Sequence, residues 1–79
     1  MKTLAFPIQL TPEPDGGYSA TCPILPGCHS QGDSLEDAKV NMREAIELVI
    51  EDMIANGEPI PDPAQTLLTS VVVEVGSAA

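Results

Sequence analysis

The sequence predicts an α+β domain with the order β-β-β-α-β, in which a mainly antiparallel four-stranded sheet carries one helix on one face. Apolar residues alternate with other residues in the segments 3–11 and 18–22, a pattern typical of strands that bury one face. The segment 67–75 is rich in β-branched residues, which favour strands. Between residues 35 and 56 apolar residues instead recur every three or four positions, as they do in an amphipathic helix. Glycine- and proline-rich sequences separate these segments, which indicates turns between the elements.

The first three strands are expected to form an antiparallel meander. PEPDGG, residues 12–17, supplies a turn between the strands 3–11 and 18–22. PILPG, residues 23–27, supplies a second turn, after which CHSQ can pair back as the third strand. Because proline cannot donate a backbone hydrogen bond, the missing N–H of Pro7 should face an unpaired side or a bulge. The first strand carries its apolar side chains on one face: Leu4, Phe6, Ile8 and Leu10.

A single long helix is predicted next. Ser34 occupies the position of an N-cap, and Asp37, three residues later, makes a short variant of the capping box. The helix therefore begins at about Leu35. Gly57 is a typical left-handed terminator, and Pro59 prevents the helix from resuming. The stripe expected to be buried comprises Leu35, Ala38, Met42, Ala45, Ile46, Val49, Ile50 and Met53.

The last predicted strand, LLTSVVVEV at residues 67–75, follows a proline-rich connector, EPIPDPAQ. A right-handed crossover would make it parallel to the first strand, beside which it can add. One helix covers only one face of a sheet, so Leu68 and Val72 on the opposite face would invite a second subunit. A chain of 79 residues also leaves much apolar surface uncovered. We therefore expect a homo-oligomer, either a dimer or a tetramer.

Acidic residues dominate the charge of the chain, with 12 Asp and Glu against 3 Lys and Arg and a formal net charge of −9. We expect no direct binding of nucleic acid, because it requires clustered Lys and Arg against phosphates. An acidic surface suits a basic protein partner, although a soluble cytosolic protein without such a partner can be equally acidic.

A cytoplasmic location without membrane contact is expected. No segment reaches the roughly 18 to 20 continuous apolar residues of a membrane span. The start of the chain has one lysine and an early proline, and it does not resemble a signal peptide. Cysteines in the cytoplasm are normally reduced.

Two cysteines and the only histidine fall within residues 22–29 and raise the question of a metal or redox site. Cys22 and Cys28 are farther apart than the usual pair of zinc ligands, and the adjacent Cys28 and His29 would point to opposite faces of a strand. A cross-link is disfavoured in a reducing compartment. We therefore expect buried or half-buried thiols and a surface histidine, and no metal, cofactor or catalytic residue.

Short motifs follow one another in a specific order between residues 15 and 63. They are Asp15, Gly17 and Tyr18; Pro23, Pro26 and Gly27; Gly32, Asp33 and Ser34; and Gly57, Glu58, Pro59, Ile60 and Pro61. In this order and spacing, the chain resembles the HicB-like antitoxin family. With the flanking strands, the resemblance covers nearly the whole chain.

The resemblance implies a partly formed ribonuclease H-like fold, which agrees with the β-β-β-α-β order. It also implies that the chain binds and neutralises HicA, a small basic toxin that cleaves messenger RNA. Many members repress their own operon through an added C-terminal DNA-binding domain. We expect residues 1–79 to form a single HicB-like domain without that addition, so autorepression does not follow from the resemblance.

Two alternatives to toxin capture remain open. The chain could be a stand-alone regulatory or structural oligomer, or the remnant of a metal-dependent nuclease using Glu47, Asp52 or Glu74. Nuclease activity does not follow from the fold, since no acid that could help to hold metal ions lies between Lys2 and Thr11. For toxin capture, the expected contact residues are Glu44, Glu47 and Glu51 on the solvent side of the helix.

Overall fold

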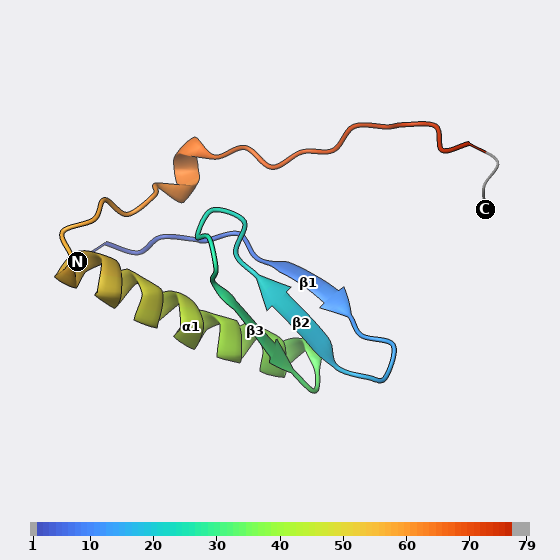
Figure 1. Ribbon diagram of the computed structural model, residues 1–79, viewed down its shortest axis with the longest axis horizontal. Coiled ribbons are helices and arrows are strands. Elements are labelled where there is room, and N and C mark those ends of the chain that lie inside the picture. Colours follow the sequence, from blue (N-terminus) through green and yellow to red (C-terminus); the bar gives the residue numbers. More distant parts are fainter. Residues whose placement is uncertain (1, 77–79) are drawn as a thin grey trace.

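A computed structural model describes residues 2–76 and contains three strands followed by one long helix (Figure 1). The strands β1 (Gln9–Pro12), β2 (Tyr18–Thr21) and β3 (His29–Gly32) form an antiparallel sheet in the order β1-β2-β3. Helix α1 spans Leu35–Ala55, and a short 3₁₀ helix, η1, spans Pro63–Gln65. The α+β class and the order of the first four elements are therefore confirmed.

The two predicted turns set the register of the sheet. The β1–β2 hairpin pairs Gln9 with Thr21 and Pro12 with Tyr18. Its turn uses glycines at positive φ, including Gly17 at +80°, a backbone conformation that side-chain-bearing residues rarely adopt. The corner between β2 and β3 is closed by the N–H of Cys22, which donates to the carbonyl of Cys28 at 3.1 Å.

Helix α1 begins and ends where its sequence signals predict. The Oγ of Ser34 accepts a hydrogen bond from the N–H of Asp37 at 3.1 Å, which satisfies one of the free N–H groups of the first turn. At the other end, the N–H of Glu58 donates to the carbonyl of Met53 at 2.9 Å, and Gly57 has a φ of +70°. This is the Schellman arrangement, in which a left-handed glycine ends the helix.

The hydrophobic core lies between α1 and the sheet, mainly over β3 and β2. The predicted stripe of α1 is buried at its centre, and Ile50 and Met53 pack partly against the core. Leu35 differs from the prediction, because it is 44% exposed in the first turn of the helix. The buried core residues are Ala20, Cys22, Leu25, Cys28, Ala38, Met42 and Ile46.

The first strand is shorter than predicted. We expected it over residues 3–11, but β1 begins only at Gln9. The reason lies in its partner, because β2 ends at Thr21, opposite Gln9, and the chain then turns into the corner. Residues before Gln9 have no β2 residue left to pair with, and Pro7 lies within this unpaired part.

The predicted fourth strand is absent from the sheet within the described part of the chain. Residues 67–75 form no strand and run clear of the sheet as an exposed tail (Figure 1). The radius of gyration is 15.3 Å, whereas a compact chain of this length is expected to have about 12 Å. The sequence pattern of a strand is present, but the chain after η1 runs past the sheet and pairs with none of its three strands.

Candidate functional site

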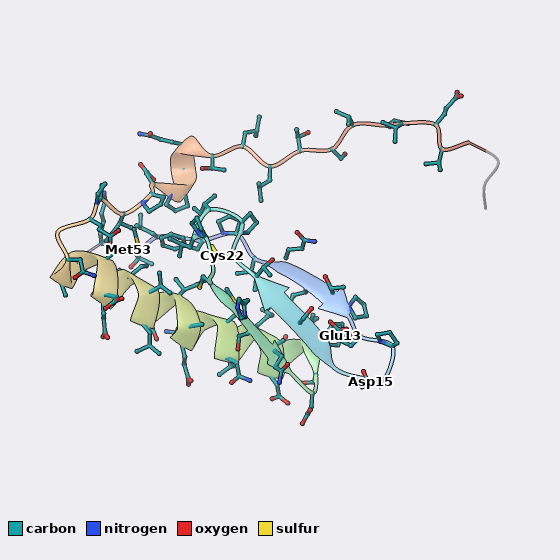
Figure 2. All side chains as sticks on the ribbon, viewed as in Figure 1. Glu13, Asp15, Cys22 and Met53 are labelled. Atoms are coloured by element: carbon teal, nitrogen blue, oxygen red, sulfur yellow. The ribbon has the colours of Figure 1, made fainter. Side chains whose placement is uncertain are left out.

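An acidic groove of about 670 Å³ lies where the β1–β2 hairpin, the end of β3 and the start of α1 meet. The charged side chains that line it are all carboxylates. Figure 2 shows Glu13 and Asp15 at the hairpin end of the sheet, away from Cys22 and Met53. The acidic groove is lined by Glu13, Asp15, Gly16, Gly17, Tyr18, Gln31, Gly32, Asp33, Asp37, Val40 and Asn41.

Two glycines let the backbones approach closely at the floor of this groove. A Cβ at Gly17 would lie 2.8 Å from the carbonyl oxygen of Gly32. A Cβ at Gly32 would in turn lie 2.7 Å from the Cα of Ala38 in α1. Because real Cβ atoms do not come this close to backbone, only glycine permits the hairpin, β3 and α1 to meet here. The Asp-Gly-Gly and Gly-Asp-Ser motifs therefore shape the acidic groove.

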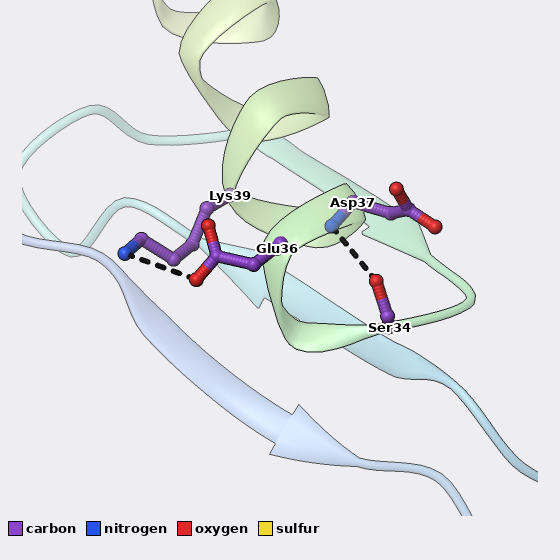
Figure 3. Close-up of polar contacts among 4 residues, drawn as sticks. All are labelled: Ser34, Glu36, Asp37 and Lys39. Atoms are coloured by element: carbon purple, nitrogen blue, oxygen red, sulfur yellow. Dashed lines mark hydrogen bonds and ion pairs between the residues drawn. The ribbon is translucent and has the colours of Figure 1, made fainter.

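The start of α1 places one carboxylate of the acidic groove, that of Asp37, next to the N-cap residue Ser34 (Figure 3). Asp37 lies in the first turn, where the positive end of the helix dipole favours a negative charge. Glu36, in the same turn, pairs with Lys39 at 3.7 Å between Oε1 and Nζ. Asn41 joins α1 to β3 beside the groove, because its Nδ2 donates a hydrogen bond to the carbonyl of Gln31 at 2.8 Å. Exposed carboxylates such as those of the groove can receive Lys or Arg side chains of a partner.

An apolar groove of about 830 Å³ lies between α1 and the residues that precede β1. It exists because α1 covers β3 and β2 more than β1. All three basic residues of the chain line it, so positive charge is separated from the acidic groove. The apolar groove is lined by Lys2, Thr3, Leu4, Phe6, Ile8, Lys39, Arg43, Ile46, Glu47, Ile50, Ile54 and Ile60.

The predicted contact residues Glu44, Glu47 and Glu51 lie exposed on α1, outside the acidic groove. Glu47 borders the apolar groove and pairs with Arg43 at 4.0 Å between Oε2 and Nε. The sequence pattern did not assign any of the four carboxylates of the acidic groove to a binding site. The turn motifs that contain Asp15 and Asp33 were visible, but only the fold shows that the two turns meet.

The cysteines belong to the core. Cys22 and Cys28 are free thiols, each 4% exposed, and both contact the apolar cluster of the core, while His29 is exposed. Burial, and secondarily the neighbouring Cys22, raise the pKa of the Cys28 thiol. A raised pKa keeps the thiol protonated and unreactive at neutral pH. The expectation of buried thiols and a surface histidine is confirmed.

The residues named for a nuclease remnant do not come together. Glu47 and Asp52 lie on α1, whereas Glu74 lies in the exposed tail (Figure 1). Within residues 2–76, no three His, Cys, Asp or Glu side chains are grouped closely enough to hold a metal ion. Among the same residues, no helix combines the length and the apolarity needed to cross a membrane.

Comparisons with a family model, with curated proteins and with solved structures each find matches to this chain. Residues 6–74 match a family described as HicB-like antitoxin of bacterial toxin–antitoxin system. A UPF0150 protein of Synechocystis sp. is 55% identical over 56 residues, which are 71% of each chain. Antitoxin HicB 1 of Photorhabdus laumondii is 32% identical over 80% of this chain, which spans only 41% of that protein. The solved N-terminal domain of antitoxin HicB from Burkholderia pseudomallei superposes with a TM-score of 0.60 and 39% identity, covering 71% of this chain and 64% of that one.

Proposed function

Because this chain belongs to the HicB-like antitoxin family of bacterial toxin–antitoxin systems, we propose that it binds and neutralises a small basic, messenger-RNA-cleaving toxin of the HicA type. The observation that carries the proposal is the family match over residues 6–74, which includes the sheet, α1 and the connector. The net charge of −9 supports it, because a protein that holds RNA needs a cationic surface that an acidic protein can cover.

The proposed mechanism is steric and electrostatic and needs no chemistry by the antitoxin. Antitoxin homologues suggest a non-enzymatic regulatory role. Carboxylates compete with RNA phosphates for the Lys and Arg side chains of the toxin, and the bound antitoxin then blocks access to its active surface. We propose that a single domain performs this in the cytoplasm, where messenger RNA is cleaved.

Two acidic surfaces could contact the toxin, and we propose the acidic groove. Its four acidic residues line one hollow, whereas Glu47 on α1 is already paired with Arg43. The carboxylates Glu44, Glu47 and Glu51 on α1 remain the alternative surface.

The first experiment mixes the purified chain with a purified HicA-type toxin in an RNA-cleavage assay. We expect cleavage to stop near a one-to-one ratio and to resume as added salt screens the contact. Undiminished cleavage, together with no heat of binding in calorimetry, would contradict toxin capture and favour a stand-alone oligomer.

The second experiment separates the two surfaces by charge reversal. We expect Asp15→Lys combined with Asp33→Lys to weaken toxin binding by about 10-fold or more, as the loss of close charge pairs does. Glu44→Lys combined with Glu51→Lys is the matched control, with the same change in net charge. Weaker binding by the control pair alone would assign the contact to α1 instead. Circular dichroism of both variants checks that the helix is retained.

Self-association is a further part of the proposal. The tail at residues 67–75 exposes a row of apolar side chains, and such a row is unfavourable in water unless another surface covers it. A sheet completed to four strands, as in a partial ribonuclease H-like fold, would supply that cover.

A further inference from the structure

The exposed tail, residues 67–75, has the composition of a buried strand. Val72 is 99% exposed and Leu67 is 86% exposed. Valine and threonine favour strands, and Glu74 is the only charged residue of the tail. In an extended conformation, one face carries Leu67, Thr69, Val71, Val73 and Val75. This face needs an apolar surface and an unpaired strand edge.

The outer edge of β1 is such an unpaired edge. Glu13 and Gly17, the pair that follows the β1–β2 ladder, are hydrogen-bonded, with the N–H of Glu13 donating to Gly17. Hydrogen-bonded and non-bonded pairs alternate along antiparallel strands. The backbone groups of Leu10 therefore point away from β2, and those of Ile8 follow the same alternation. Pro12 also falls on this outward side, where its missing N–H breaks no ladder bond.

The apolar groove lies beside this edge and has room for side chains. Its walls include Phe6 and Ile8 from the segment before β1, and Ile46, Ile50 and Ile54 from α1. Phe6, Ile8 and Ile50 are only partly buried although they pack against the core. The bases that border the groove are opposite in sign to Glu74. A strand added to β1 would direct one of its faces into this groove.

The connector directs the tail away from its own sheet. Pro59, Pro61 and Pro63 fix φ in the segment that leaves α1. The side chain of Asp62 caps η1, accepting from the N–H of Ala64 at 3.0 Å. Figure 1 shows the chain after η1 running past the sheet instead of alongside β1. Domain swapping, in which two copies exchange an identical element, is a low-cost route to a dimer, and an element held off its own sheet is available for such an exchange.

From these observations we propose that the tail of each chain adds as a fourth strand to the β1 edge of a second copy and fills the apolar groove there. This inference rests on the self-association part of the proposed function and names its segment, edge and partner. The tail and the segment 3–11 are equal in length, so one strand can cover the other from end to end. The exchange is reciprocal, which gives a closed dimer with two identical contacts.

Analytical ultracentrifugation of the full-length chain alone tests the proposal. We expect a dimer, and we expect Val73→Asp to weaken it on the order of 100-fold, because one substitution places a charge in both grooves of the dimer. Leu48→Asp on α1 is the matched control, since Leu48 is 65% exposed and lines neither groove. Val73 makes no contact that the sheet and α1 require, so the variant should keep the helix content of the wild type.

The outcomes separate the proposal from its alternatives. A monomeric wild type, or a dimer disrupted by Leu48→Asp but not by Val73→Asp, would overturn it. Isotope-filtered NMR on a mixture of labelled and unlabelled chains should show contacts between Val73 of one copy and Ile8 of the other. Contacts found only within one copy would also overturn it. If the wild type is monomeric and Val73→Asp abolishes toxin binding, the tail is a toxin contact, and the proposed function stands without this inference.

Discussion

The sheet–helix unit, residues 9–55, and the tail, residues 67–75, both carry the sequence signals of regular secondary structure but have opposite surroundings. Leu25 in the corner between β2 and β3 is 2% exposed, whereas Val72 in the tail is 99% exposed. Local signals specify the type of each element: alternation for strands, and spacings of three and four for α1. They do not specify the partner. The unit finds its partners within the chain, and the tail finds none among the described residues.

The sharpest contrast between buried and exposed positions is expected from Leu25→Ala. It removes a fully buried side chain from the core of a small domain, so we expect the free energy of unfolding to fall by about 2–5 kcal/mol. Leu48→Ala, at an exposed position of α1, should change it by less than about 0.5 kcal/mol. Urea denaturation followed by circular dichroism at a fixed protein concentration measures both. Equal effects would mean that the core is not where the fold places it.

A glycine comparison tests the close approach that forms the acidic groove. In Gly32→Ala the new Cβ meets backbone of α1, so we expect a loss of about 1–3 kcal/mol, as for overpacking of a well-packed site. Gly76→Ala, just after the tail, has nothing within 4 Å of its Cβ and should leave stability unchanged. The same denaturation assay applies, and a neutral Gly32→Ala would show that β3 and α1 do not meet so closely.

Two serines, Ser34 at the N-cap of α1 and Ser70 in the tail, provide a matched pair of substitutions. Ser34→Ala removes the hydrogen bond to the N–H of Asp37, and such caps contribute about 1 kcal/mol. Ser70→Ala changes an exposed tail residue for which no stability effect is expected. Thermal unfolding followed by the circular-dichroism signal of the helix compares the two variants. Equal melting temperatures would contradict the assignment of Ser34 as the N-cap of α1.

The smallest expected effect is a dependence of stability on alkaline pH. Burial, then the neighbouring Cys22, raise the pKa of Cys28 in the folded state. The folded thiol therefore keeps its proton at a pH where the unfolded thiol has lost it. Its contribution to stability is complete below the unfolded pKa and is lost as the pH rises through the folded pKa. Cys28→Ala should flatten the alkaline decline of the unfolding free energy, and an unchanged slope would contradict this assignment.

Much of the fold was predictable because its signals are local. The order of the three strands, the cap at Ser34 and the end of α1 at Gly57 each depend on a few neighbouring residues. The length of the first strand was not predictable from its own alternation, because it depends on where β2 ends. The acidic groove was missed for a similar reason, since Asp15 and Asp33 lie in separate turns that only the glycine contact brings together.

Hydrogen exchange at a series of protein concentrations tests most directly whether the tail is a strand awaiting a second copy. We predict that the amides of residues 67–75 and the outward-facing amides of Ile8 and Leu10 become protected together as concentration rises. The amides of α1 should remain protected throughout. Tail amides protected equally at every concentration, or at none, would contradict the account.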